Sequence, residues 1–90
     1  MKITFDPAKR EAALTNRGLD FAQADEVFAG LHATLPDDRQ DYGEPRFISA
    51  GMLADRLVVV VWTPRGDARR IISMRHAHER EVQRWQQHME

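Results

Sequence analysis

Residues 69–81 read Arg-Arg-Ile-Ile-Ser-Met-Arg-His-Ala-His-Glu-Arg-Glu, and the pattern of side chains changes within this segment. Ile71 and Ile72 are β-branched and suit a half-buried strand. Ser73 is a favourable N-cap, because its hydroxyl can accept a hydrogen bond from a free N–H in the first turn of a helix. From Met74 onward the apolar residues recur at helical spacing. The segment therefore predicts a strand over residues 68–72 that is followed directly by a helix beginning at Met74.

At about 100° per residue, this predicted helix has an apolar side and a separate basic stripe. The apolar side consists of Met74, Val82, Trp85 and Met89, with Ala77 at its margin, and the basic stripe consists of His76, Arg80 and Arg84. Glu81 falls on the apolar side beside Trp85, where an unpaired buried carboxylate is costly. We therefore expect Glu81 to pair with Arg70 or Arg75.

Upstream, residues 2–5 alternate between apolar and polar and predict a short strand. Asp6 is a good N-cap, Pro7 suits the first helical position and Gly18 suits the position after the last turn, so a helix is predicted over residues 7–17. Asp20, with a glutamine three residues later, resembles a capping box for a second helix that continues to about residue 29.

The rest of the chain up to residue 63 is predicted to form the strands of a sheet. Strands are predicted over residues 31–36, 45–53 and 56–63, the last two joined by the two-residue connection Ala54-Asp55, and a polar loop covers residues 37–43. The run Leu57–Trp62 is apolar without alternation, which is typical of a central strand covered on both faces. The prediction is an α+β fold in which helices pack on an antiparallel sheet, in the order β-α-α-β-β-β-β-α.

The composition is that of one small intracellular domain. The 90 residues contain no cysteine and no apolar run near the roughly 20 residues of a membrane-spanning helix. We therefore expect a soluble, cytoplasmic protein without disulfides.

The overall charge is −1, but residues 6–44 carry −5 and residues 65–84 carry +3. This asymmetry indicates either a phosphate-binding face or, more simply, two solvated faces.

Several motifs in the same order carry a family resemblance. The segment Arg70-Ile-Ile-Ser-Met-Arg75-x-Ala-x-x-x-Glu81-x-x-x-Trp85 resembles the C-terminal signature of the BrnT family, which more often ends in Tyr. The segments Phe5-Asp-Pro-x-Lys9, Gly18-Leu-x-Phe-x-x-Ala-x-x-Val-Phe28 and Gly43-Glu-x-Arg46 also agree with this family. One departure is that many members carry Lys-His where this chain has Asn16-Arg17.

The resemblance implies a RelE-like fold and the activity of a ribonuclease toxin from a bacterial type II toxin–antitoxin pair. It further implies a BrnA-type antitoxin made from the same operon, a hetero-oligomer with that antitoxin, and binding of operator DNA only through the antitoxin. RNA is the implied substrate, with neither a cofactor nor a membrane involved.

Cleavage of RNA without a metal requires groups that bind phosphate, neutralise its developing charge and move two protons. As catalytic residues we predict Arg75, Glu81, Arg70 and Arg80. As RNA-binding residues we predict Arg46, Arg65, Arg69, His76 and Arg84. Whether Arg75 binds phosphate or only pairs with Glu81 stays open at this point. The general acid and base also stay open, among Glu81, Glu44, His76 and His78.

The sequence disfavours other kinds of site. His76 and His78 point about 200° apart on a helix, and no His-x-x-x-His pattern occurs, so a metal site is not expected. A glycine-rich phosphate loop and a serine-hydrolase elbow are absent from the sequence. Two readings remain, a ribonuclease toxin or a small α+β module that binds protein or nucleic acid without catalysis.

Overall fold

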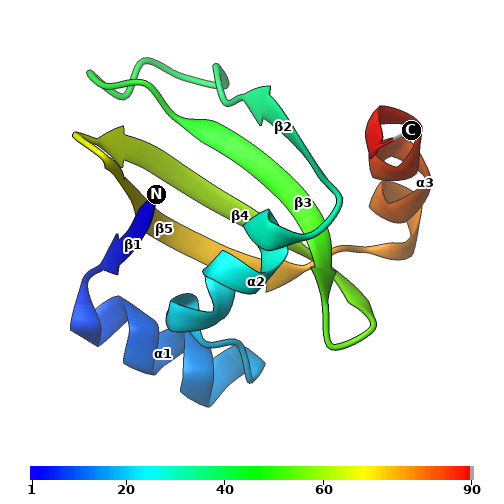
Figure 1. Cartoon of the computed structure of the whole chain (residues 1–90), viewed down its shortest axis with the longest axis horizontal. Helices are drawn as coiled ribbons and strands as arrows, with labels where there is room; N and C mark the ends of the chain where they lie inside the picture. The colour runs from blue at the N-terminus through cyan, green and yellow to red at the C-terminus, as the bar shows by residue number, and fades with distance from the viewer. Residues whose placement is uncertain (90) are drawn as a thin grey trace.

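In the computed structural model, which describes residues 1–89, three α-helices and a short 3₁₀ turn pack against a five-stranded sheet (Figure 1). The elements in chain order are β1 (Lys2–Phe5), α1 (Pro7–Arg17), the 3₁₀ turn η1 (Phe21–Gln23), α2 (Ala24–Ala29), β2 (His32–Pro36), β3 (Phe47–Leu53), β4 (Arg56–Arg65), β5 (Ala68–His76) and α3 (Glu79–Met89). The predicted fold class and element order are confirmed.

The strands lie in the order β1-β5-β4-β3-β2, so β4 is the middle strand. Neighbouring strands are antiparallel except β1, which pairs in parallel with the first half of β5. The prediction of an antiparallel sheet therefore holds for four strands and misses the direction of β1. Parallel neighbours cannot be joined by a tight turn, and here the whole of the intervening chain separates β1 from β5.

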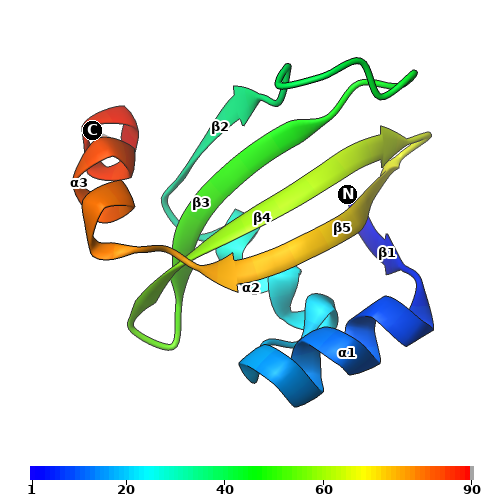
Figure 2. The same cartoon turned by 180° about the vertical axis from the view of Figure 1, so that it is seen from behind.

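The side chains of β4 alternate between two apolar cores on opposite faces of the sheet. Val58, Val60 and Trp62 pack against α1, η1 and α2, whereas Leu57 and Val59 pack beneath α3. Figures 1 and 2 show α3 standing apart from the other helices. We call these two sides the α1 face and the α3 face. The apolar run in β4 is thus covered on both faces, as its lack of alternation predicted.

The first helix begins and ends where the sequence predicted. The Asp6 carboxylate accepts a hydrogen bond from the backbone N–H of Ala8 at 2.9 Å, which satisfies a free donor of the first turn. Gly18 follows the helix with φ 67°, a left-handed conformation that favours glycine, and its N–H donates to the carbonyl of Leu14.

The second predicted helix is divided. Asp20 caps as expected, its side chain accepting from the N–H of Ala22 at 2.9 Å, but the first turn is η1 and the α-helix begins at Ala24. In the hairpin of β3 and β4, Ala54 and Asp55 both have positive φ, at 50° and 65°, so they form the predicted two-residue turn.

The prediction for residues 69–81 is wrong in one respect, because the strand does not end at Ile72. β5 continues to His76 and α3 begins only at Glu79. Ser73 therefore lies in the strand and does not cap a helix. Met74 is a fully buried strand residue in the core of the α1 face.

The cause of this error is a β-bulge. Trp62 pairs with Ile71 and the preceding Val61 pairs with Ser73, so Ile72 has no partner on β4. The extra residue breaks the two-residue alternation of the strand. Ile71 and Met74, three positions apart, consequently face the same core, a spacing that is also typical of a helix.

The true start of α3 is set by His78 and Glu81. The His78 carbonyl accepts the first helical hydrogen bonds, and the Glu81 carboxylate accepts a hydrogen bond from the His78 N–H at 2.9 Å. This is the acidic half of a capping box, with the carboxylate three residues into the helix. The apolar side predicted from Val82, Trp85 and Met89 is confirmed, since these residues pack on the α3 face.

Candidate functional site

The α3 face of the sheet is only partly covered. Helix α3 packs over Ala33, Ala50, Leu57 and Val59, towards one end of the strands. Farther along β4, Val61 is only half-buried, although its neighbours on both sides in the strand are buried. We call this half-buried region, formed by Ile48, Val61, Arg70 and Ser73, the open face.

The bulge brings two arginines of β5 to this side. Arg70 pairs with Thr63 and Arg75 pairs with Val59, and both partners lie on the side of β4 that carries Val61. The two guanidinium groups therefore project from the same face. Within residues 1–89, the Arg70 side chain makes neither an ion pair nor a side-chain hydrogen bond. The Arg70 side chain is half-buried.

Arg75 is fixed by Glu81, as the sequence analysis expected. Two parallel hydrogen bonds of 2.6 and 2.8 Å join the guanidinium to the two carboxylate oxygens. These bonds lower the pKa of Glu81 to about 2 and outweigh burial, which alone would raise it. The pKa of Arg75 is raised, mainly by the same bonds. The pair is thus ionised at neutral pH, and Glu81 is a poor proton acceptor.

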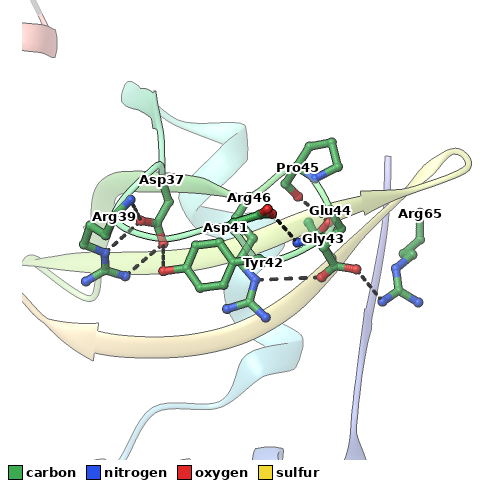
Figure 3. A network of polar contacts seen from close by, with 10 residues as sticks. Asp37, Arg39, Asp41, Tyr42, Gly43, Glu44, Pro45, Arg46 and Arg65 are labelled. Carbon is green, nitrogen blue, oxygen red and sulfur yellow. Dashed lines mark hydrogen bonds and ion pairs between the residues drawn. The ribbon is translucent and has the colours of Figure 1, made fainter.

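The loop between β2 and β3 ends two residues before Ile48 of the open face. It is held in place by Asp37 (Figure 3). The Asp37 carboxylate is fully buried and accepts hydrogen bonds from Arg39 at 2.7 and 2.8 Å and from the Tyr42 hydroxyl at 3.2 Å. The pKa of Asp37 is lowered, chiefly by Arg39. The positive charge of Arg39 acts to lower the pKa of Arg75, against the effect of Glu81. The Arg39 guanidinium therefore lies near the pair of Arg75 and Glu81.

Arg46 ends the same loop. Its carbonyl accepts the Asp37 N–H at 2.8 Å, which continues the ladder between β2 and β3. Its guanidinium stacks over the Tyr42 ring, 3.9 Å from the centroid, and lies 3.8 Å from Glu44. Glu44 in turn accepts a hydrogen bond from Arg65 at 3.1 Å (Figure 3). The predicted residues Arg46 and Arg65 are therefore linked through one carboxylate.

Two predicted RNA-binding residues lie on the opposite side of the sheet. The Arg69 guanidinium stacks on Phe28 and Trp62, at 3.9 and 5.0 Å from their ring centroids, and burial lowers its pKa. His76 pairs with Val58, a residue of the α1 face, and its pKa is lowered by burial first and by Arg56 second. Neither side chain belongs to the open face.

Helix α3 carries the two remaining arginines, Arg80 and Arg84, and both are exposed. Arg84 lines a hollow of about 240 Å³ that also includes Glu81 and Trp85. This hollow therefore borders the pair of Glu81 and Arg75 from the side of the helix. Arg80 makes no ion pair with any residue that the structure describes.

Sequence reasoning missed two features. The first is the role of Asp37, because the sequence predicts only a polar loop here; the short Asp-x-Arg spacing from Asp37 to Arg39 is the one sequence signal for it. The second concerns the Asn16-Arg17 segment. The Arg17 guanidinium donates a hydrogen bond to the carbonyl of Met74 at 2.8 Å, so the end of α1 is attached to β5 next to Arg75.

Among residues 1–89, no group of three His, Asp or Glu side chains is arranged to hold a metal ion. None of the helices in this part of the chain has the length and apolar character needed to cross a membrane. Around the open face, Arg75 lies beside Glu81 and Arg46 lies near Glu44, so guanidinium groups and carboxylates are the charged groups of this region. Planar guanidinium groups bind phosphate through two N–H donors at once and stay charged at every physiological pH.

Comparison with known proteins identifies the family of the chain. A search among curated proteins finds none that matches. A family model described as "Ribonuclease toxin, BrnT, of type II toxin-antitoxin system" matches residues 5–81. The matched region contains every element from α1 to β5 and ends at Glu81. The chain therefore belongs to the BrnT family of ribonuclease toxins.

Proposed function

We propose that this toxin is a metal-independent endoribonuclease that binds RNA on the open face. The observation that carries the proposal is the placement of Arg70 and Arg75 on one face: Arg70 has no partner within residues 1–89, and Arg75 is held rigidly by Glu81. Preorganised cations beside a reacting phosphate stabilise the charge that develops in the transition state.

In this proposal Arg70 and Arg75 contact the non-bridging oxygens of the scissile phosphate. Glu81 is a positioning residue, because a carboxylate with a pKa of about 2 fixes Arg75 but removes a proton only weakly at neutral pH. Arg46, which stacks on Tyr42 at the end of the loop between β2 and β3, also contacts the RNA in this proposal. Arg80 and Arg84 extend the positive surface along α3.

The reaction begins when the ribose 2′ oxygen attacks phosphorus and loses its proton. The bond from phosphorus to the 5′ oxygen then breaks and that oxygen takes up a proton, so the products are a 2′,3′-cyclic phosphate and a 5′ hydroxyl. For the two proton transfers we propose two residues. One is Glu44, whose carboxylate lies beside Arg46 and Arg65 in the loop, and the other is His78, whose backbone N–H is bonded to Glu81 at the start of α3.

The type II family implies a protein antitoxin. We propose that a BrnA-type antitoxin neutralises this chain by covering the basic surface, that the two form a hetero-oligomer in the cytoplasm, and that operator DNA binds only through the antitoxin. An acidic partner surface would make this contact sensitive to salt, because exposed ion pairs are screened. A complex that is indifferent to salt would contradict a mainly electrostatic contact.

The central experiment is a cleavage assay on the purified chain with single-stranded RNA in the presence of EDTA. The expected result is cleavage that leaves 2′,3′-cyclic phosphate ends, no cleavage of an RNA with 2′-deoxy sugars, and inhibition by the co-purified antitoxin. RNA binding without cleavage would instead support the non-catalytic binding module.

A further inference from the structure

A second hollow, of about 290 Å³, lies between α1 and the edge of β5. β1 pairs with β5 only as far as Ile71, so the edge of β5 beyond that point has no neighbouring strand in the described part of the chain. Helix α1 lies along this edge (Figure 2). The hollow is lined by Lys9, Ala12, Ala13, Asn16, Arg17, Phe21, Ile72 and Ser73.

The shape of this hollow follows from the sequence of α1. Lys9, Ala12, Ala13 and Asn16 are spaced by three, four and seven positions and share one face of the helix. The two alanines leave space in the middle of that face, because their side chains are short. Lys9 and Asn16 stand on either side of this space.

The lining divides into an apolar floor and a polar rim. Phe21 and Ile72 form the floor together with the two alanines, while Lys9, Asn16 and Arg17 form the rim. Small-molecule sites are typically apolar with a few placed polar groups and have volumes from roughly 300 Å³ upward. A nucleobase with its phosphate fits this chemistry, since an apolar floor receives the base, an amide can bind its edge and two cations attract the phosphate.

The hollow also adjoins the open face. The Arg17 guanidinium is bonded to the carbonyl of Met74, the residue before Arg75. Ser73 lines the hollow and pairs with Val61 of the open face, so the two sites share one segment of β5. A single strand of RNA that crosses the free edge of β5 therefore reaches both.

We propose that this hollow, which we call the edge pocket, binds a nucleotide of the RNA that flanks the phosphate held by Arg70 and Arg75. Lys9 and Arg17 contact its phosphate, and Asn16 contacts the edge of its base. The inference rests on the proposed function, because it assigns a second subsite to the same substrate.

The test measures binding of a single-stranded 2′-O-methyl RNA, which lacks the attacking hydroxyl and so is not cleaved by this mechanism. Fluorescence anisotropy gives the dissociation constant at several salt concentrations. Ala12→Leu fills the edge pocket, and Ala8→Leu is the matched control, an exposed alanine of the same helix outside the pocket. Lys9→Gln removes a phosphate contact, and Lys2→Gln is its control on β1. Melting temperatures check that all four variants fold.

Ala12→Leu is expected to weaken binding by about fivefold or more, the loss typical of one base contact, while Ala8→Leu binds as the wild type does. Lys9→Gln is expected to reduce the slope of log affinity against log salt by about 0.7, the value for one phosphate of a single strand, and Lys2→Gln leaves the slope unchanged. Wild-type affinity in Ala12→Leu, or an unchanged slope in Lys9→Gln, would overturn the edge pocket. Failure of the proposed function is separate, because it shows as wild-type protein that does not cleave natural RNA.

Discussion

Arg70 and Arg75 are five positions apart on β5 and project from the same face of the sheet, opposite Thr63 and Val59. In a regular strand an odd separation places two side chains on opposite faces. The unpaired Ile72 supplies the extra residue that restores the common face. The bulge is therefore what gathers the two guanidinium groups around one phosphate in the proposed mechanism.

Arg69 and Arg70 offer a direct test of this face assignment, because they are neighbours on opposite sides of the sheet. Arg70→Gln is expected to lower kcat/KM for RNA cleavage by about 100-fold or more, the cost of removing one preorganised donor to a transition-state oxyanion. Its melting temperature should stay near that of the wild type, since the Arg70 side chain forms no ion pair with any residue from 1 to 89.

Arg69→Gln is expected to show the reverse pattern. The change removes the stack on Phe28 and Trp62 and should lower the free energy of unfolding by about 1–2 kcal/mol, measured by urea denaturation. Cleavage by the folded variant should stay within a few-fold of wild type. Equal losses of cleavage in both variants would contradict the separation of the two faces.

The pair of Arg75 and Glu81 predicts how stability depends on acid. The pKa of Glu81 falls from its ordinary 4.5 to about 2 on folding. A lowered folded-state pKa gives stability that is fully present above the unfolded value and disappears as the pH falls towards the folded value. Because both side chains are partly exposed, we expect Glu81→Gln to cost about 1 kcal/mol at pH 7 after solvent screening.

This cost should shrink as the pH is lowered from 4.5 towards 2, and unfolding curves of wild type and Glu81→Gln across that range measure it. The comparison with wild type is essential, because Asp20 and Asp37 also have lowered pKa values. Their protonation in acid lowers the stability of wild type and of Glu81→Gln alike. A difference that is constant with pH would show that Glu81 acts only through packing.

Local signals allowed the fold to be predicted where one residue acts on its neighbours. Asp6 and Gly18 bound α1 as expected, because capping depends on groups within one turn. The apolar run of β4 marked the middle strand, because a strand covered on both faces has no reason to alternate. Likewise the charge and position of Glu81 were enough to predict that it pairs with Arg70 or Arg75, and the structure shows that the partner is Arg75.

The errors arise where the sequence pattern is ambiguous or the contact is distant. A bulge gives Ile71 and Met74 the spacing of a helix, so no local rule separates the two structures at Ser73. The burial of Asp37 depends on the path of the whole loop, and the edge pocket depends on where β1 stops pairing. Both features depend on contacts between segments that are far apart in the sequence, and no local pattern of residues predicts such contacts.

Gly51 provides a test of the packing between α2 and the sheet. A Cβ at this position would lie 2.9 Å from the Val27 Cγ1 atom and 3.2 Å from the Val27 carbonyl oxygen, so α2 would have to move. Gly51→Ala is therefore expected to lower the free energy of unfolding by about 1–3 kcal/mol, as overpacking commonly does. Gly30→Ala is the control, because its Cβ would meet only the Glu26 carbonyl oxygen at 3.9 Å. Equal stability of the two variants in urea would contradict the close approach of α2.

Asp37 provides a test of whether the loop beside the open face is held in place. In Asp37→Asn the charge that holds Arg39 is lost, and an amide N–H₂ replaces one of the two acceptor oxygens. Trypsin should then cleave after Arg39 several times faster than in the wild type, because the loop opens more often, and a digestion time course followed by mass spectrometry measures this rate. Asp41→Asn is the matched control, since Asp41 is exposed and, among residues 1–89, accepts only from the Gly43 N–H. Wild-type cleavage rates in Asp37→Asn would show that the backbone hydrogen bond to Arg46 is enough to fix the loop.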